Sequence, residues 1–264
     1  MFYKNKIVWI TGASSGIGEA LSYELARQEA ITILSSNQPD ELERVKQNYD
    51  KIGGQSYIQF LDITDIDKME SITKSLIEKF GRIDVLINNA GISQRALAME
   101  TPLDVDRKIM EIDYFGTIAL TKTVLPYMVK EKSGYIAATS SISGKFGFPL
   151  RSAYAAAKHA LHGFFETLRS EVFDHNIKVL IAFPGRIQTN ISFHALTKDG
   201  SAHGKMDDGQ NTGISAEKCA KQYLKAIRKD KKEVLIGSTE LLMVYIHKFF
   251  PKIFYKLARK IKPV

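Results

Sequence analysis

The sequence predicts an α/β protein with a Rossmann-type, doubly wound parallel sheet, built as a single domain with a C-terminal helical appendage. Short apolar runs rich in β-branched residues alternate with segments of helical periodicity, which is typical of a parallel sheet covered on both faces. A glycine-rich loop at residues 12–18 joins the first apolar run to the first helical segment. The 264 residues, 44% of them hydrophobic and 25% charged, suffice for one such domain.

The expected elements follow one another in strand-to-helix order. Strands are expected at residues 6–10, 31–35, 57–61, 85–87, 134–139, 178–183 and 233–236. Helices are expected at residues 18–29, 40–51, 65–80, 103–130, 153–174 and 216–228, and Pro126 should end or kink the fourth of them. Residues 196–213 are polar and rich in glycine, so we expect a mobile substrate lid over residues 190–213. Residues 1–237 then form the dinucleotide-binding and catalytic domain, and residues 238–264 a basic amphipathic C-terminal segment.

The bulk properties argue against several classes of protein. The first nine residues are too short for a secretory signal, and no run of about 18 apolar residues predicts a spanning helix. The single cysteine, Cys219, excludes an internal disulfide and suits a cytoplasmic protein. Most of the net charge of +8 lies in residues 238–264, where six basic residues face one acid, so we expect no nucleic-acid binding. The six histidines show no metal-ligand spacing, and no metal is expected.

The loop Thr11–Gly18 has the chemistry of a dinucleotide site. Gly12 permits a tight turn, Gly16 lets backbone N–H groups approach a pyrophosphate, and Gly18 lets the helix pack against the strand. The phosphates would lie at the helix N-terminus, beside Ser14, Ser15 and Ile17. A glycine-rich turn without a ligand is the alternative. The spacing lacks the Gly-Lys-Ser/Thr of a P-loop, which argues against phosphoryl transfer.

The residues after the second expected strand indicate which dinucleotide is bound. An acid at this position would hold a ribose 2′-hydroxyl and repel a 2′-phosphate. Ser36 and Asn37 stand there, and no acid occurs before Asp40. Since no arginine or lysine stands there either, the hydroxyl and amide groups would have to bind the phosphate. NADP(H) is therefore favoured over NAD(H).

Ser141, Tyr154 and Lys158 form a candidate catalytic set. Tyr154 and Lys158 are four residues apart near a helix start, so both side chains project from one face. A nearby ammonium stabilises a phenolate by about 1.4 kcal/mol for each unit of pKa shift, as a general acid/base acting on an alcohol requires. Ser141 ends a strand, where open α/β sheets bind ligands. Tyr-x-x-x-Lys alone is more often a chance helix pair, so the prediction depends on the glycine loop and Ser141 as well.

With these motifs in order, the chain resembles the short-chain dehydrogenase/reductase family across residues 6–237. The resembling motifs are TGASSGIG at 11–18, LDIT at 61–64, NNAG at 88–91, the Ser141 strand end, YAAAK at 154–158 and PGRIQT at 184–189. The resemblance implies hydride transfer between NADP(H) and a carbonyl or alcohol substrate, with Tyr154 as general acid/base and Ser141 polarising the substrate oxygen. It also implies a homodimer or homotetramer formed through the helices at 103–130 and 153–174.

The resemblance further implies the cofactor contacts. Asp62 would contact the adenine with Ile63 beside it, and Asn88 would stabilise the central strand. Lys158 would hold the nicotinamide ribose as well as tuning Tyr154. Asp62 as a helix cap and Asn88 as a turn residue remain as alternatives. The other residues implied to line the cofactor are Asn89, Ala90, Gly91, Pro184, Gly185, Ile187 and Thr189.

Asp113 departs from the family pattern, because an asparagine often occupies this place and its backbone holds a water in the proton relay. If the relay uses the backbone carbonyl, Asp113 can support it. If the carboxylate faces Lys158, it keeps the lysine charged but competes with the phenolate for that charge. We therefore expect a working relay with an altered pH dependence.

The C-terminal segment combines aromatic and apolar residues with spaced lysines. It could lie on an anionic membrane, or it could pack over the substrate cleft or a partner subunit. The segment resembles that of a branch of the family that contains membrane-associated, lipid-type reductases such as dehydrogenase/reductase member 7B, which suggests a hydrophobic substrate. A different class of function also stays open: a nucleotide-binding scaffold or redox sensor at a membrane surface, whose chemistry is vestigial.

Overall fold

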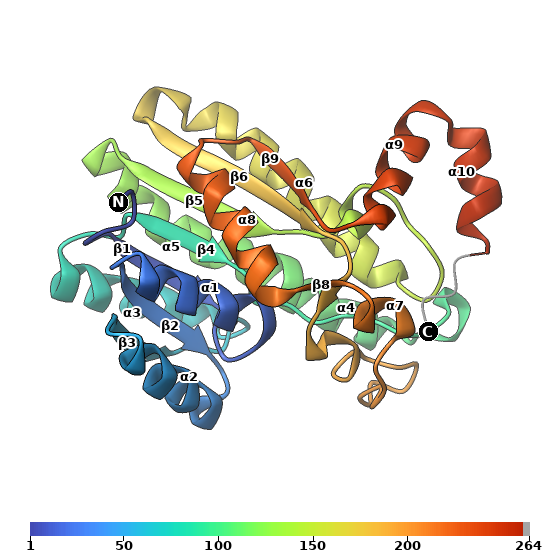
Figure 1. Ribbon diagram of the computed structural model, residues 1–264, viewed down its shortest axis with the longest axis horizontal. Coiled ribbons are helices and arrows are strands. Elements are labelled where there is room, and N and C mark those ends of the chain that lie inside the picture. Colours follow the sequence, from blue (N-terminus) through green and yellow to red (C-terminus); the bar gives the residue numbers. More distant parts are fainter. Residues whose placement is uncertain (261–264) are drawn as a thin grey trace.

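A computed structural model describes residues 1–260, in which seven parallel strands form one central sheet (Figure 1). In spatial order the strands are β3 (Gln55–Phe60), β2 (Ile31–Ser36), β1 (Ile7–Thr11), β4 (Val85–Asn88), β5 (Gly134–Thr139), β6 (Ile177–Pro184) and β9 (Glu233–Ile236). This arrangement confirms the predicted Rossmann-type fold. Lys262, one of the basic residues counted above, lies outside the described residues.

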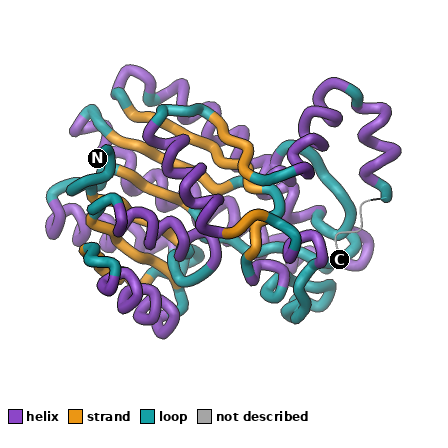
Figure 2. The backbone as a smooth tube through the Cα atoms, viewed as in Figure 1, coloured by secondary structure: helices purple, strands orange, loops and turns teal. Residues whose placement is uncertain are grey.

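Helices cover both faces of the sheet, as Figure 2 shows by the helices on either side of the strands. One face carries α1 (Gly16–Arg27), α2 (Pro39–Lys51) and α8 (Ala216–Arg228). The other carries α3 (Ile66–Phe80), α4 (Leu103–Met110), α5 (Gly116–Glu131) and α6 (Ser152–Glu171).

Successive side chains of the buried strand β1 point to opposite faces of the sheet and pack into two separate hydrophobic cores. Val8 and Ile10 of β1 belong to the cluster packed under α1 and α8, whereas Ile7 and Trp9 belong to the cluster packed under α5 and α6. Because both faces are covered, β1 is apolar at every position from Ile7 to Ile10 instead of alternating with polar residues.

The long helix expected at 103–130 is interrupted at a different place from the one predicted. Pro126 lies inside α5, so the prediction that it ends the helix was wrong, while a kink at Pro126 stays a prediction. Pro126 is exposed, and water can bond the helical carbonyl that its missing N–H leaves free. The interruption is instead a π-helical turn, η2 (Glu111–Phe115), between α4 and α5. Such turns occur often at functional sites, and this one holds Asp113.

The segment between β6 and α8 lies beside the carboxyl ends of the strands. It contains β7 (Ile187–Gln188), which pairs with β8 (Ile214–Ser215), and the short helix α7 (Asp208–Asn211). Leu196 exchanges backbone hydrogen bonds with Ser93 and Arg95, both at 2.8 Å. Leu196 and Asp207 are buried, so even the polar part of this segment contributes side chains to the interior. Its mobility stays a prediction.

The C-terminal residues form a pair of short helices, α9 (Leu242–Phe249) and α10 (Pro251–Ala258), which project from the end of the molecule opposite the N-terminus (Figure 1). Phe254 and Ala258 pack against Ile142 and Phe146, in the loop after β5. Within residues 1–260, no helix combines the length and the apolar character needed to cross a membrane.

Candidate active site

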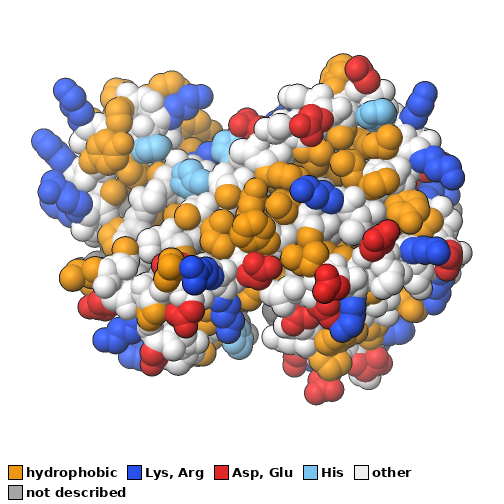
Figure 3. Space-filling view, turned by 180° about the vertical axis from the view of Figure 1, so that it is seen from behind, with side chains coloured by type: hydrophobic (Ala, Val, Ile, Leu, Met, Phe, Trp, Pro, Cys, Tyr) orange, Lys and Arg blue, Asp and Glu red, His pale blue; other side chains and the backbone are white. Residues whose placement is uncertain are grey.

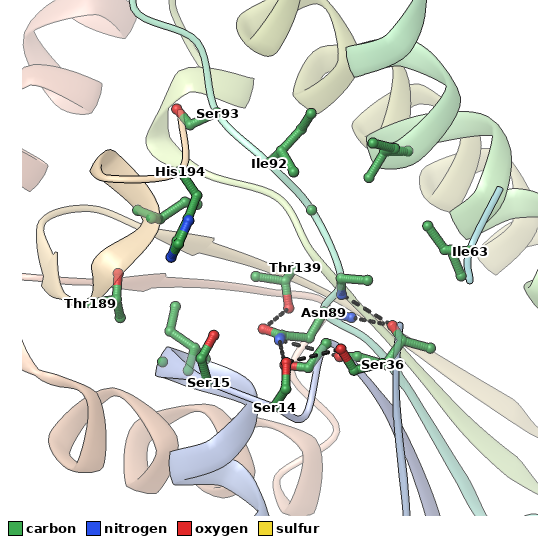
Figure 4. A pocket seen from close by; sticks show the side chains of 18 of the residues that line it. Ser14, Ser15, Ser36, Ile63, Asn89, Ile92, Ser93, Thr139, Thr189 and His194 are labelled. Carbon is green, nitrogen blue, oxygen red and sulfur yellow. Dashed lines mark hydrogen bonds between the residues drawn. The ribbon is translucent and has the colours of Figure 1, made fainter. Parts of the chain in front are cut away.

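A cavity of about 660 Å³ opens at the carboxyl ends of the parallel strands. The loops that follow β1, β2, β3, β4, β5 and β6 all contribute to its wall (Figure 4). Because the carboxyl ends of parallel strands meet at one edge of the sheet, motifs that are far apart in the chain come together here.

The glycine loop is shaped by contacts that leave no room for side chains. Gly12 has φ +64°, and a Cβ there would lie 2.8 Å from the Ala90 Cα atom. A Cβ at Gly18 would lie 2.0 Å from the Gly12 carbonyl oxygen, so Gly18 serves the packing of α1 on β1. Ser15, the N-cap of α1, makes no capping bond with its side chain, which leaves the N–H groups of the first turn free for an anion.

Asn89 ties this loop to the central strands. Its Nδ2 donates to the carbonyl oxygens of Thr11 and Gly12, each at 3.3 Å, and its Oδ1 accepts from Thr139 Oγ1 at 3.3 Å. Figure 4 shows these side chains meeting beneath the cavity. Asn88 points away from it and donates to Thr121 Oγ1 of α5 at 3.0 Å, within the second core. Asn88 therefore links β4 to α5 and is not a turn residue.

The cavity wall at the end of β2 is made of neutral side chains. Ser36 and Ser14 share a hydrogen bond of 2.9 Å between their hydroxyls. Asn37 lies beside them and points its Nδ2 at Asp62 Oδ2, 3.5 Å away. Hydrogen bonds from the Thr64 N–H and hydroxyl lower the pKa of Asp62. Asp62 thus forms a local turn with Thr64 while also lining the cavity, and it does not cap α3, which begins after Asp65.

Ser141, Tyr154 and Lys158 all line the opposite part of the cavity. The Lys158 Nζ atom lies 5.5 Å from the centre of the Tyr154 ring and donates to the Thr139 carbonyl at 3.3 Å. Ser141 lies two residues after the end of β5, where its hydroxyl accepts from the Ser143 N–H at 3.1 Å and donates to the Pro184 carbonyl at 3.4 Å. These contacts hold the serine and the lysine in place from two neighbouring strands.

The Asp113 carboxylate faces Lys158, which decides between the two alternatives drawn from the sequence. Its Oδ2 lies 3.0 Å from Lys158 Nζ, and its Oδ1 accepts from the Ile92 N–H at 2.7 Å. Burial alone would lower the pKa of Lys158, but the charge of Asp113 and the neighbouring Tyr154 raise it above its ordinary value. Burial raises the pKa of Asp113, and Lys158 opposes that rise. Since both carboxylate oxygens face donors, the pair is a buried ion pair.

A second buried charged cluster borders the same cavity. Arg95, in the loop after β4, donates from Nε to both oxygens of Asp207, at 3.1 and 3.0 Å, and from its Nη2 to Oδ2. Arg151, which precedes α6, donates to Asp207 Oδ2 at 3.1 Å. The cluster therefore joins three segments, each from a different part of the chain.

The structure brings nearly all of the predicted site residues to one cavity. Gly18 and Asp113 are the two that do not line it, because Gly18 packs behind the loop and Asp113 lies behind Lys158. Sequence reasoning missed further lining residues, although Thr139 and Ser140 directly precede Ser141 and Arg151 lies three residues before Tyr154. The other missed side chains with polar groups are Thr11, Ser35, Gln38, Thr64, Ser93, Lys108, Glu111, Asn190, His194 and Gln210.

One cluster of titratable side chains and the single cysteine lie outside this cavity and have structural roles. His162, Glu166 and Glu233 lie close enough to hold a cation, but the Lys145 ammonium already bonds Glu233 at 2.9 Å. Burial raises the pKa of the Cys219 thiol to about 12, so this cysteine is a core residue and not a nucleophile.

The comparisons with known proteins agree with this geometry. Residues 6–199 match the family model described as short chain dehydrogenase. The chain belongs to the short-chain dehydrogenase/reductase family. It is 40% identical to "Dehydrogenase/reductase SDR family member 7B" of Mus musculus, over 97% of this chain and 81% of that protein. It is also 40% identical to family member 7 of Homo sapiens, over 93% of this chain and 74% of that protein. The family consists of oxidoreductases, and these relatives place the chain in its member 7 and 7B branch.

Solved structures of the family share the fold. A short-chain dehydrogenase from Streptomyces avermitilis superposes with a TM-score of 0.79 at 26% identity, covering 96% of each chain. A member from Burkholderia phymatum, solved in complex with NAD, has a TM-score of 0.83 at 20% identity and covers 100% of this chain and 98% of its own. An alcohol dehydrogenase from Thermococcus sibiricus complexed with 5-hydroxy-NADP has a TM-score of 0.76 at 23% identity, over 89% of this chain and 97% of its own.

Proposed function

We propose that the chain transfers a hydride between NADP(H) and a carbonyl or alcohol substrate, with Tyr154 as the general acid/base. The observation that supports this most is one cavity lined both by the glycine loop and by Ser141, Tyr154 and Lys158. A vestigial scaffold would not need to keep this set together, and we do not favour that alternative.

The residues at the cavity fit a dinucleotide. The glycine loop excludes side chains where a pyrophosphate would lie, and the free N–H groups at the start of α1 supply donors for it. Asp62 and Ile63 would lie beside the adenine, and Pro184, Gly185, Ile187 and Thr189 beside the nicotinamide; all six line the cavity. When bound, the nicotinamide supplies or accepts the hydride.

The side chains of the catalytic set would move the proton. Tyr154 gives a proton to the developing alkoxide during reduction and takes it back during oxidation. Ser141 donates a hydrogen bond to the reacting oxygen, and for this its hydroxyl must leave the long 3.4 Å contact with the Pro184 carbonyl. Lys158 donates to the Thr139 carbonyl and lies at ion-pair distance from Asp113, which leaves ammonium hydrogens to hold a ribose hydroxyl.

Oxidation of NADPH with a panel of aldehydes, ketones and steroids tests this function. We expect turnover in the wild type and a loss of roughly 10² to 10⁴-fold in kcat for Tyr154→Phe, with cofactor binding preserved. Cofactor binding without turnover on any member of the panel would contradict the proposal.

The preference for NADP(H) rests on the neutral wall at the end of β2, where Ser14, Ser36 and Asn37 can donate to a 2′-phosphate. An Asn37→Asp variant should lower the ratio of kcat/KM for NADPH to that for NADH by on the order of tenfold to a hundredfold, because the new carboxylate repels the phosphate. Gln47→Glu makes the same charge change on the exposed face of α2 and should leave the ratio unchanged. A wild type that prefers NADH would refute the preference.

A hydrophobic substrate and a peripheral membrane contact are also proposed. Exposed apolar side chains on α9 and α10 (Leu242, Tyr245, Phe249, Phe250, Ile253) lie among Lys248, Lys252, Lys256 and Arg259. Figure 3 shows basic side chains at the outer edge of this appendage. Vesicles rich in phosphatidylserine should sediment the protein, and Lys→Glu changes at the three lysines should abolish that binding. A control protein carries the same Lys→Glu changes at Lys51, Lys74 and Lys229. An equal loss of vesicle binding in the two triple variants would refute the contact.

A homodimer or homotetramer in the cytoplasm completes the proposal. Leu103 of α4 and Phe115 of η2 expose apolar side chains beside the helices through which we expect the subunits to pair. Light scattering should report an oligomer that Phe115→Glu weakens, and a monomeric wild type would contradict it. A fluorescent fusion seen outside the cytoplasm would contradict the location.

A further inference from the structure

The two buried charged clusters beside the cavity differ in their charge balance. In one, the Lys158 ammonium is matched by the Asp113 carboxylate at 3.0 Å. In the other, the single carboxylate of Asp207 faces two guanidinium groups, those of Arg95 and Arg151. The second cluster therefore keeps one positive charge that no carboxylate in it compensates.

The surplus charge lies with Arg151. Each nitrogen of Arg95 has an acceptor, since Nε and Nη2 bond Asp207 and Nη1 donates to Ser93 Oγ at 2.8 Å and to the Gln94 carbonyl at 2.6 Å. Arg151 reaches Asp207 with one Nη2 bond only, and its buried Nε has no hydrogen-bond partner among the residues that the structure describes.

Arg151 and Tyr154 stand one helical turn apart at the start of α6 and face the same cavity. Burial lowers the pKa of Arg151 to about 10, with Arg95 acting in the same direction, while Tyr154 and Asp207 raise it. Arg151 is therefore still protonated at neutral pH, and its side chain is only 15% exposed, so water screens the charge poorly.

No other titratable side chain around the phenol, within residues 1–260, removes this surplus. Lys108, at the end of α4, and Glu111, in η2, both line the cavity and carry opposite charges. Arg186 and His194 are exposed. The remaining group is His203, whose Nε2 lies 4.0 Å from Asp207.

We propose that Arg151 is a positioning residue that acts through Tyr154, because its uncompensated guanidinium stabilises the phenolate, while Asp113 neutralises much of the field of Lys158. Asp207 then sets how much of the Arg151 charge the phenol experiences. This inference rests on the proposed role of Tyr154 as the general acid/base.

The direct test is an NMR titration of isotope-labelled tyrosine in the full-length protein, without and with NADP⁺. The Tyr154 resonance is assigned by its absence in Tyr154→Phe. In Arg151→Gln we expect the titration midpoint of Tyr154 to move upward by on the order of one pH unit, because a positive charge has been removed. Arg151→Lys keeps the charge and should restore most of the wild-type midpoint.

Two further variants make the outcome specific. Arg27→Gln removes an arginine from the exposed end of α1 and should leave the midpoint unchanged. Asp207→Asn leaves two arginines uncompensated and should move it downward. Arg151→Gln still leaves Arg95 bonded to Asp207, so we expect it to fold, which thermal unfolding can check.

The acidic limb of the pH–rate profile for alcohol oxidation should follow the same directions. An unchanged Tyr154 midpoint in a folded Arg151→Gln protein overturns the inference. So does a rise in KM for the substrate with an unmoved midpoint, since Arg151 would then be a substrate-binding residue. If Tyr154→Phe retains wild-type turnover, it is the proposed catalytic function that fails, whatever the titration shows.

Discussion

The half of the cavity beside the glycine loop and the half beside α6 are built by different means. The first consists of backbone and, apart from Asp62, neutral side chains, in which Ser14 and Ser36 bond each other and Asn89 bonds the main chain. The second holds two clusters of buried charges, Asp113 with Lys158 and Arg95 with Asp207 and Arg151.

Substitutions should therefore destabilise the two halves by different mechanisms. Steric fit shapes the glycine-loop half, so a single added methyl group can displace it. Charge balance holds the α6 half, and removing one member leaves an uncompensated charge in a medium of low dielectric constant.

Lys158→Met should have the largest effect, because it leaves the Asp113 carboxylate buried with only the Ile92 N–H as a partner. We expect a loss of about 3–5 kcal/mol in the free energy of unfolding, together with loss of turnover. Adding Asp113→Leu should restore most of the stability without the activity. Urea denaturation measures the free energy of unfolding of both variants. If Lys158→Met alone is as stable as the wild type, charge balance does not hold this half together.

Gly18→Ala tests the other half. The added Cβ would lie 2.0 Å from the Gly12 carbonyl oxygen, so α1 or the loop must shift. We expect a loss of about 1–3 kcal/mol in stability and weaker binding of NADPH, measured by thermal unfolding and by fluorescence titration. Gly163→Ala is the matched control, since its Cβ meets nothing within 4 Å on α6 and should slightly stabilise the helix. Equal behaviour of the two variants would argue against steric fit.

Asp113→Asn sharpens the account of the catalytic half without deleting its lysine. The substitution removes the charge that neutralises Lys158, which then stabilises the phenolate more strongly. The acidic limb of the pH–rate profile for alcohol oxidation should move to lower pH by on the order of one unit. A profile identical to that of the wild type would refute the competition between Asp113 and the phenolate.

Asp62→Asn should have the smallest effect, because this carboxylate is a half-buried turn residue without a charged partner, in the glycine-loop half. Hydrogen bonds from Thr64 lower its pKa in the folded protein, so it stabilises the fold above its unfolded pKa near 4. We expect the variant to lose a few tenths of a kcal/mol at pH 7 after solvent screening. The difference should disappear as the pH falls through the lowered folded pKa, and thermal unfolding at pH 7 and pH 3 checks this.

Sequence patterns predicted most of the architecture, because local rules govern it. The strands at 134–139 and 233–236 and the helix at 216–228 have the expected bounds, since each is a continuous run bordered by turn residues. Pro126 was misjudged because its effect depends on whether the freed carbonyl faces water, which only the packed structure reveals.

By itself the sequence determined the glycine loop, the neutral residues after β2 and the order of Ser141, Tyr154 and Lys158, because backbone conformation and side-chain type are local properties. The direction of the Asp113 carboxylate required the tertiary structure, since it depends on the π-helical turn that aims Asp113 at Lys158. Asp207 likewise meets Arg95 from 112 residues away along the chain. Buried charges of this kind carry no local pattern, because their cost and their balance arise only after distant segments have excluded water from around them.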